Sequence, residues 1–308
     1  MNPGEREFLL SLFSFKNKLS DNLKIKKLYE ISNNVEKHYK ICSIKKRNGK
    51  KRTIYMPDYY LKNIQRNILK DFLYDKKSSK YTTSYIKNKS IYDNAKEHIN
   101  KKYIIKLDIK DFFNNLSFID VYNIYDSYGI NKNISILLTY LSTYNDFLPQ
   151  GSPTSAYLSN LILRKFDYEI GEYCKENNIS YTRYSDDMTF SMNTLNKEII
   201  NIVRKKLYKY GLELNNNKIK IVSNYFKQIV TGLVVNKKVQ VDIKYRKKIR
   251  QELYYINKYG LKSHLNRINI TNKKQYIDSL KGRILFVLNI DKDNKEFKEY
   301  LNIIKQLT

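Results

Sequence analysis

The stretch YTRYSDDMTF, residues 181–190, sets two adjacent aspartates between two short runs whose side chains alternate in type. Alternation with a period of two is typical of a β-strand that buries one of its faces. After the acids, Met188 and Phe190 would share one face and Thr189 would lie on the other. The sequence therefore predicts a β-hairpin with the acidic pair at its tip.

A second strand is predicted within KKYIIKLDIKDFF, residues 101–113, which is apolar enough to be central in a sheet and closes at Asp108. If that strand neighbours the hairpin, Asp108 meets Asp186 and Asp187. Carboxylates at close range repel one another unless cations neutralise them, and all-oxygen ligands favour Mg²⁺ or Mn²⁺. Two such ions would clamp the oxygens of a phosphoryl transfer. An Asp-Asp pair is also ordinary turn chemistry, so the sequence alone leaves the adjacency open.

Charge points to a polyanionic partner. The chain has 58 Lys and Arg against 30 Asp and Glu, a formal charge of +28, which attracts nucleic acid. An AT-rich genome would also enrich Lys, Asn, Ile and Tyr without any selection for binding. Cys42 and Cys174 form no CxxC pair, which excludes a disulfide framework and suits a reducing cytosol. No apolar run approaches the roughly 18 residues that cross a bilayer, so we expect no membrane partner.

Five motifs, in chain order, resemble those of reverse transcriptases. YSDD (184–187) is similar to their Tyr-x-Asp-Asp box, and LDIKDFFNNL (107–116) to their first aspartate motif. The remaining three are the fingers block KRTIYMPDYYLKNIQRNIL (51–69), the loop and helix LPQGSPTSAYLSNLIL (148–163) and the glycine-to-lysine motif GLELNNNKIKI (211–221). The order and spacing agree with this family from about residue 40 to 235.

Two further segments resemble signatures of retron reverse transcriptases, namely NAKEH (94–98) and VTG (230–232). The resemblance implies a bacterial, cytoplasmic RNA-directed DNA polymerase that copies its cognate noncoding RNA (msr-msd) from a 2′-OH primer into msDNA. It also implies a separate effector protein and a role in antiphage defence. Two alternatives stay open. One is a reverse transcriptase of group II intron or abortive-infection type, and the other is a non-catalytic RNA-binding subunit.

The same resemblance implies an α+β fold, that of a right-hand polymerase with an antiparallel palm sheet, fingers and a small helical thumb. N-terminal helices and fingers would occupy residues 1–100. The palm would span residues 101–236, with a fingers insertion at about 115–150. A basic helical thumb would follow at 237–308, where the composition changes.

The resemblance also assigns catalytic residues. Asp108, Asp186 and Asp187 would bind two Mg²⁺ ions, with Mn²⁺ as a substitute. The backbone of Ile109 would lie beside them as a further ligand.

Four residues would contact the incoming nucleotide. Phe113 sits five residues after Asp108, where the family places a steric gate against a ribose 2′-OH, so dNTPs would be the substrates. Gln150 would reach the sugar, and Arg52 would grip the triphosphate because a guanidinium matches phosphate bidentately. Lys218 would protonate or neutralise the leaving pyrophosphate. The alternatives are an ordinary core aromatic at Phe113 and one more surface lysine at Lys218.

The remaining assignments concern RNA and primer. Asn94 and His98 would support retron RNA or a local scaffold, and Thr231 and Gly232 would lie near the primer. A basic helix with interleaved tyrosines would bind the structured noncoding RNA through phosphates and stacking. Its cations are Lys244, Arg246, Lys247, Lys248 and Arg250.

Overall fold

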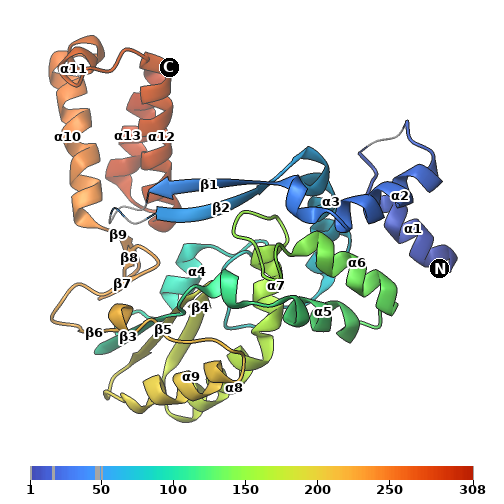
Figure 1. The fold of residues 1–308 in the computed structure, drawn as a ribbon. Coiled ribbons are helices and arrows are strands. Elements are labelled where there is room, and N and C mark those ends of the chain that lie inside the picture. The colour runs from blue at the N-terminus through green and yellow to red at the C-terminus, as the bar shows by residue number, and fades with distance from the viewer. Residues whose placement is uncertain (1, 16–17, 46–48, 50, 308) are drawn as a thin grey trace. The chain divides into compact units, whose positions relative to one another are not determined.

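The computed structural model of the chain describes residues 2–15, 18–45, 49 and 51–307. Helices and short strands alternate along this part of the sequence (Figure 1), and the two sheets with defined registers are antiparallel. The predicted α+β class is confirmed. The chain divides into two compact units. Unit 1 comprises 1–88, 106–188 and 196–219, and unit 2 comprises 89–105, 189–195 and 220–308.

Unit 1 contains an antiparallel hairpin of β1 (Tyr39–Lys45) and β2 (Lys51–Pro57). Tyr39 pairs with Pro57 at one end of this hairpin, and Lys45 pairs with Lys51 at the other. The predicted turn between them includes Asn48, which lies outside the described residues.

The helices of unit 1 precede and follow this hairpin along the chain. The Asp58 carboxylate caps the N-terminus of α3 by accepting the Leu61 N–H at 2.9 Å, a common way to satisfy a free helical donor. The full set is α1 (Pro3–Ser11), α2 (Asp21–Ser32), α3 (Tyr59–Asp71), α5 (Phe118–Ser127), α6 (Lys132–Ser142), α7 (Ser155–Ile162), α8 (Arg164–Glu176) and α9 (Glu198–Tyr208). Short 3₁₀ turns are η1 (Val35–His38), η2 (Leu73–Asp75), η3 (Phe112–Asn115) and η4 (Asn216–Lys218).

The strand predicted to close at Asp108 lies beside the acidic hairpin. A four-stranded sheet has the order β4-β5-β3-β6. Its strands are β3 (Tyr103–Asp108), β4 (Ser180–Tyr184), β5 (Asp187–Met192) and β6 (Lys220–Ser223). The predicted adjacency is therefore confirmed, and Ser185 and Asp186 form the turn between β4 and β5.

The prediction that this hairpin buries only one face is wrong. Thr182, Arg183, Thr189 and Ser191 are buried, just as their apolar neighbours are. Polar side chains tolerate this burial because they have polar partners inside the protein. Arg183, for example, pairs with a carboxylate that is itself fully buried.

Unit 2 combines a small antiparallel sheet with helices. The sheet has the order β7-β8-β9, with strands β7 (Ile229–Val230), β8 (Leu233–Val234) and β9 (Gln240–Val241). The helices are α4 (Ile91–Lys96), α10 (Ile243–Tyr259), α11 (Leu261–Arg267), α12 (Lys273–Ile290) and α13 (Lys295–Gln306). In the described part of the chain, every helix is too short or too polar to span a membrane.

Candidate active site

Backbone hydrogen bonds join the end of β3 to the tip of the β4–β5 hairpin. The Ile109 N–H donates to the Asp186 carbonyl at 3.1 Å. On the other side, the Asn215 N–H donates to the Asp108 carbonyl at 2.8 Å. Acids that are 78 residues apart in the sequence are therefore held by main-chain contacts rather than by their side chains alone.

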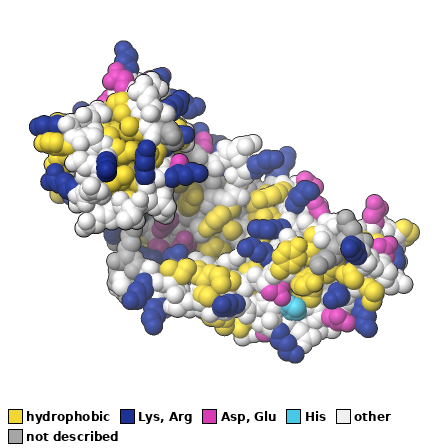
Figure 2. All heavy atoms as spheres, turned by 90° about the horizontal axis from the view of Figure 1, so that it is seen from above, with side chains coloured by type: hydrophobic (Ala, Val, Ile, Leu, Met, Phe, Trp, Pro, Cys, Tyr) yellow, Lys and Arg dark blue, Asp and Glu magenta, His cyan; other side chains and the backbone are white. Residues whose placement is uncertain are grey.

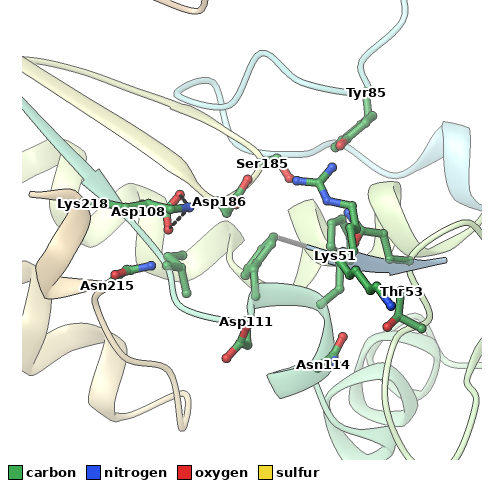
Figure 3. A pocket seen from close by; sticks show the side chains of 15 residues that line it. Lys51, Thr53, Tyr85, Asp108, Asp111, Asn114, Ser185, Asp186, Asn215 and Lys218 are labelled. Carbon is green, nitrogen blue, oxygen red and sulfur yellow. Dashed lines mark hydrogen bonds and ion pairs between the residues drawn. The ribbon is translucent and has the colours of Figure 1, made fainter. Parts of the chain in front are cut away.

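Lys218 supplies positive charge to this cluster. Its ammonium donates to both carboxylate oxygens of Asp108, at 2.8 and 2.7 Å (Figure 3). Asp108 is 6% exposed. Burial opposes the charge on Lys218, but its hydrogen bonds and ion pairing with Asp108 outweigh that effect and raise the pKa of Lys218.

Neighbouring carboxylates raise one another's pKa in this cluster. Burial, followed by the charges of Asp187 and Asp108, raises the pKa of Asp186 to about 6. The pKa of Asp187 is also raised, by loss of solvent around its carboxyl and by Asp108, although the residue as a whole is exposed. A site in which acids resist ionisation has a deficit of positive charge.

A divalent cation fits the donor chemistry here. The side-chain ligands are all carboxylate oxygens, which suit Mg²⁺ or Mn²⁺, and the Lys218 ammonium already stands where positive charge is needed. Among the described residues, however, no three Asp, Glu, His or Cys side chains are gathered into a preformed metal site. Metal binding by Asp108, Asp186 and Asp187 therefore stays a prediction.

A cavity of about 520 Å³ brings all four predicted nucleotide contacts together. Arg52, Phe113 and Gln150 line it, together with Asp108, Asp186 and Lys218. Phe112, next to Phe113, also lines the cavity but is 4% exposed and packs in the core, whereas Phe113 is half-buried.

The β1–β2 hairpin fixes the position of Gln150. The Tyr55 N–H donates to the Gln150 carbonyl at 2.9 Å. Gly151 follows with φ +127°, and a Cβ on it would lie 2.5 Å from the Tyr55 carbonyl oxygen. Only glycine permits this approach, so the Pro-Gln-Gly loop and β2 form one wall of the cavity.

Other residues that line the cavity carried no sequence-based assignment, among them Tyr85 and Asn215. Asn215 lies within the motif at 211–221, so its position gave a signal, although its backbone contact with Asp108 did not. Tyr85 adopts φ +59°, and no feature of the sequence around it indicates a site.

Residues 44–275 match the family of reverse transcriptases (RNA-dependent DNA polymerases). The chain belongs to this family. Retron Ec86 reverse transcriptase from Escherichia coli is 32% identical over 278 residues, which cover 87% of this chain and 81% of that protein. Retron Ec83 reverse transcriptase, also from Escherichia coli, is 31% identical over 275 residues, or 82% and 83% of the two chains. Among solved structures, Candida albicans telomerase has a TM-score of 0.49 at 14% identity, covering 92% of this chain and 68% of that one.

These relatives make the chain a reverse transcriptase of retron type, and hence an RNA-directed DNA polymerase. The retron lineage, rather than a group II intron or abortive-infection type, is confirmed.

In this retron-type enzyme the Asn-Ala-x-x-His segment is buried within unit 2. Asn94 is 1% exposed and His98 is 0% exposed. His98 Nδ1 lies 2.7 Å from Ser191 Oγ on β5. Burial, with a smaller effect of Lys101, lowers the pKa of His98 to about 3, which keeps the ring neutral. Their predicted support of RNA or of a local scaffold stays a prediction.

The Val-Thr-Gly signature forms the turn between β7 and β8. Val230 pairs with Leu233, and the two residues between them, Thr231 and Gly232, have φ +45° and +85°. Positive φ at both central positions is the geometry of a tight hairpin turn that favours glycine. Thr231 Oγ1 donates to the Ile91 carbonyl at 3.1 Å, so this turn is bonded to the first residue of α4, the helix that carries Asn94.

The basic helix of the retron-type enzyme is α10, and its cations differ in availability. Arg250 pairs with both carboxylate oxygens of Glu296, at 2.5 and 2.6 Å, and Arg246 donates to Gln240 Oε1 at 3.3 Å. Of the five cations predicted to bind RNA, Lys244, Lys247 and Lys248 are the exposed ones. Their contact with RNA is untested.

Proposed function

We propose that this enzyme copies its own structured noncoding RNA into DNA and releases an RNA–DNA product of msDNA type. The observation that carries the proposal is the meeting of Asp108 and Asp186 in one cavity with Arg52, Phe113 and Gln150. Carboxylates would provide the chemistry, Arg52 would match a triphosphate, Gln150 a sugar, and Phe113 would be the steric gate against a ribose 2′-OH. Synthesis would begin from an RNA 2′-OH.

Asp108, Asp186 and Asp187 would hold the metal, with the Ile109 backbone beside them. Bound Mg²⁺ or Mn²⁺ would supply activation of the primer hydroxyl and stabilisation of the leaving pyrophosphate. Lys218 lies 2.7 Å from Asp108, which supports the proposal that its ammonium would neutralise or protonate that pyrophosphate.

The other cavity residues would select and orient the dNTP. Arg52 on β2 would hold the triphosphate through two parallel N–H donors. Gln150, fixed by the Tyr55 hydrogen bond, would contact the sugar. Phe113 would occupy the space that a ribose 2′-OH needs and so exclude ribonucleotides.

RNA recognition is assigned to unit 2. The exposed lysines of α10 would bind phosphates, and its tyrosines would stack with unpaired bases. Thr231 and Gly232 would lie near the primer, and Asn94 and His98 would hold the scaffold for the retron RNA.

The proposed setting is the bacterial cytoplasm, where the enzyme would act with a separate effector protein in antiphage defence. Cys42 and Cys174 are both free, which suits a reducing compartment. Sequencing the nucleic acid that co-purifies with the protein from its host tests the product. A branched RNA–DNA molecule is expected, whereas messenger or intron RNA alone would contradict the proposal.

Asp186→Asn tests the catalytic assignment. Because the amide cannot replace a charged metal ligand, dNTP incorporation on an RNA template should fall at least about 10³-fold. RNA affinity, measured by fluorescence anisotropy, should stay within about threefold of the parent. The matched control is Asp126→Asn on the exposed side of α5, which should keep full activity. Undiminished incorporation by Asp186→Asn would overturn the assignment.

A further inference from the structure

Two fully buried charges lie behind the acidic hairpin tip. Arg183 Nε and Nη2 donate to the two carboxylate oxygens of Asp167, at 2.7 Å each, and both side chains are 0% exposed. A bidentate pair of this kind fixes the plane of the guanidinium. The third nitrogen, Nη1, then points toward the turn and donates to the Ser185 carbonyl at 3.0 Å.

Ser185 is held from its other side as well. Its N–H donates to Ser84 Oγ at 2.8 Å, and the Ser84 carbonyl accepts from Asn160 Nδ2 at 2.8 Å. Asn160 Oδ1 in turn accepts from Arg183 Nη1 at 3.3 Å. Ser185 has φ +62°, a left-handed conformation that costs free energy for any residue with a Cβ. Such a turn persists because its surroundings hold it.

The next peptide group is fixed too, because the Asp186 carbonyl accepts the Ile109 N–H at 3.1 Å. With the peptides on both sides of its Cα tied down, Asp186 can direct its carboxyl only where the turn allows. We infer that Arg183, locked by Asp167, is a positioning residue that fixes the Ser185 turn and thereby aims the Asp186 carboxylate into the polymerase cavity. This inference rests on the proposed role of Asp186 as a metal ligand.

Stability alone does not explain these charges. A buried ion pair is commonly no more stabilising than an apolar pair of similar volume, because desolvation offsets the attraction. An arginine in this place offers something an apolar side chain lacks. It is a donor that never loses its proton, held in one plane and directed at one carbonyl.

The test replaces the whole network with apolar groups. Arg183→Met and Asp167→Leu remove the pair, and Tyr181→Phe removes a hydroxyl that also donates to Asp167, at 2.9 Å. Of the buried polar groups nearby, the Ser185 carbonyl loses its Arg183 donor, while Asn160 Oδ1 keeps the Thr82 hydroxyl as a donor at 3.1 Å. The triple variant should therefore stay folded and unfold within about 8 °C of the parent, because one lost buried hydrogen bond costs about 1–3 kcal/mol. Its rate on a preformed RNA template and DNA primer should fall at least about tenfold, since small displacements of reacting groups are costly.

The decisive measurement is the Mg²⁺ concentration that gives half-maximal rate. A misaimed ligand should raise it about threefold or more, whereas partial misfolding lowers the rate without moving it. Ser84→Ala, which removes the acceptor for the Ser185 N–H, should raise it in the same direction and serves if the triple variant does not fold. The matched control is Tyr125→Phe, which breaks a buried hydrogen bond to Ser142 Oγ (2.9 Å) and should leave the Mg²⁺ dependence unchanged.

Asp186→Asn, assayed in parallel, separates this inference from the proposed function. If Asp186→Asn is inactive but the triple variant and Ser84→Ala both keep the parental rate and Mg²⁺ dependence, the role of Arg183 is refuted while the catalytic assignment stands. If Asp186→Asn itself polymerises normally, the proposed function falls, and the inference falls with it.

Discussion

The ammonium of Lys218 gives one positive charge to a cavity that Asp108 and Asp186 line, with Asp187 next in the chain. It binds both oxygens of Asp108, yet the pKa of Asp186 is still raised to about 6 by burial and by its acidic neighbours. The lysine side chain is 54% exposed, so its charge can move into solvent on a flexible stem. The residues thus form a site that is only partly neutralised and that further cations would stabilise.

Phe113→Val tests sugar selection at the same cavity. Shortening the side chain should open room for a ribose 2′-OH and raise the ratio of rNTP to dNTP incorporation about tenfold or more. Single-nucleotide extension with matched rNTP and dNTP measures this ratio. Phe166→Leu is the control, since Phe166 is buried in the core, does not line the cavity and should affect stability rather than selectivity. An unchanged ratio in Phe113→Val would assign Phe113 to the core instead.

At the scale of residues, motif spacing predicted the side chains that share the cavity, because their chemistry is tied to short stretches of sequence. It did not predict what holds them. Arg183 alternates with Thr182 and Tyr184, a pattern that reads as a half-solvated strand, and its partner Asp167 lies on a helix 16 residues earlier. A buried polar pair depends on what covers the strand, and a local pattern contains no information about that.

Among the elements, β5 connects a retron signature to the acidic hairpin. Asp187 begins this strand, and Ser191 farther along it contacts His98, the histidine of the Asn-Ala-x-x-His segment. The helices, in contrast, follow from sequence. Apolar residues spaced i, i+4 and i+7 along residues 243–259 indicate a helix with one buried face, and Ile249, Leu253 and Ile256 are the buried residues of α10. Helical periodicity is local, whereas the burial of a strand depends on two separate faces.

From the lowered pKa of His98 we predict that the stability of unit 2 falls in acid. Its pKa is about 3 when folded, against 6.5 for an unburied histidine, so the unfolded chain takes up the proton first as pH falls. Its contribution to stability is complete above about pH 6.5 and is lost toward pH 3. Between pH 7 and 4.5 this loss amounts to about 2–3 kcal/mol.

In His98→Gln the side chain stays neutral and can still bond to Ser191, so this share of the acid sensitivity should disappear. Urea unfolding of the parent and the variant at pH 7 and 4.5 measures it. Equal losses of unfolding free energy in both proteins would show that His98 does not titrate on unfolding.

For the whole molecule the dominant physical property is its charge of +28. Figure 2 shows Lys and Arg side chains spread over the face in view rather than confined to one element. RNA binding should therefore be strongly salt-dependent, with affinity falling about 10²-fold or more between 50 and 200 mM salt. Anisotropy titrations of a structured RNA at several salt concentrations measure the slope of log affinity against log salt concentration. A change of less than threefold would mean that phosphate contacts do not dominate.

The exposed lysines of α10 should carry a defined share of that slope. Changing Lys244, Lys247 and Lys248 to Gln should reduce it by about two to three ion equivalents. The control changes three exposed lysines of unit 1 to Gln, which keeps the change in net charge equal and should reduce the slope less. These are Lys165, Lys175 and Lys205.

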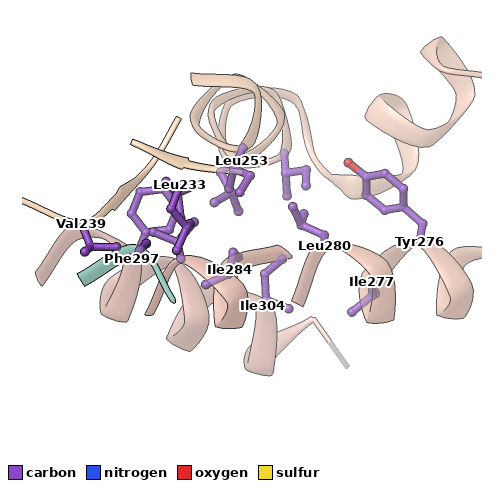
Figure 4. Close-up of a cluster of buried hydrophobic side chains, with 14 of the residues drawn as sticks. Leu233, Val239, Leu253, Tyr276, Ile277, Leu280, Ile284, Phe297 and Ile304 are labelled. Carbon is purple, nitrogen blue, oxygen red and sulfur yellow. The ribbon is translucent and has the colours of Figure 1, made fainter. Parts of the chain in front are cut away.

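The core of unit 2 is built from segments that lie far apart in the sequence. Val230, Leu233 and Val235, which precede residue 237, share one buried cluster with Leu253, Leu280 and Phe297 of the helices that follow, and Ala95 and Ile104 join it from far upstream (Figure 4). Swapping RNA specificity between retron enzymes by grafting the C-terminal helices alone would therefore split an apolar interior. A graft that respects the packing has to carry residues 89–105 and 220–236 along with them.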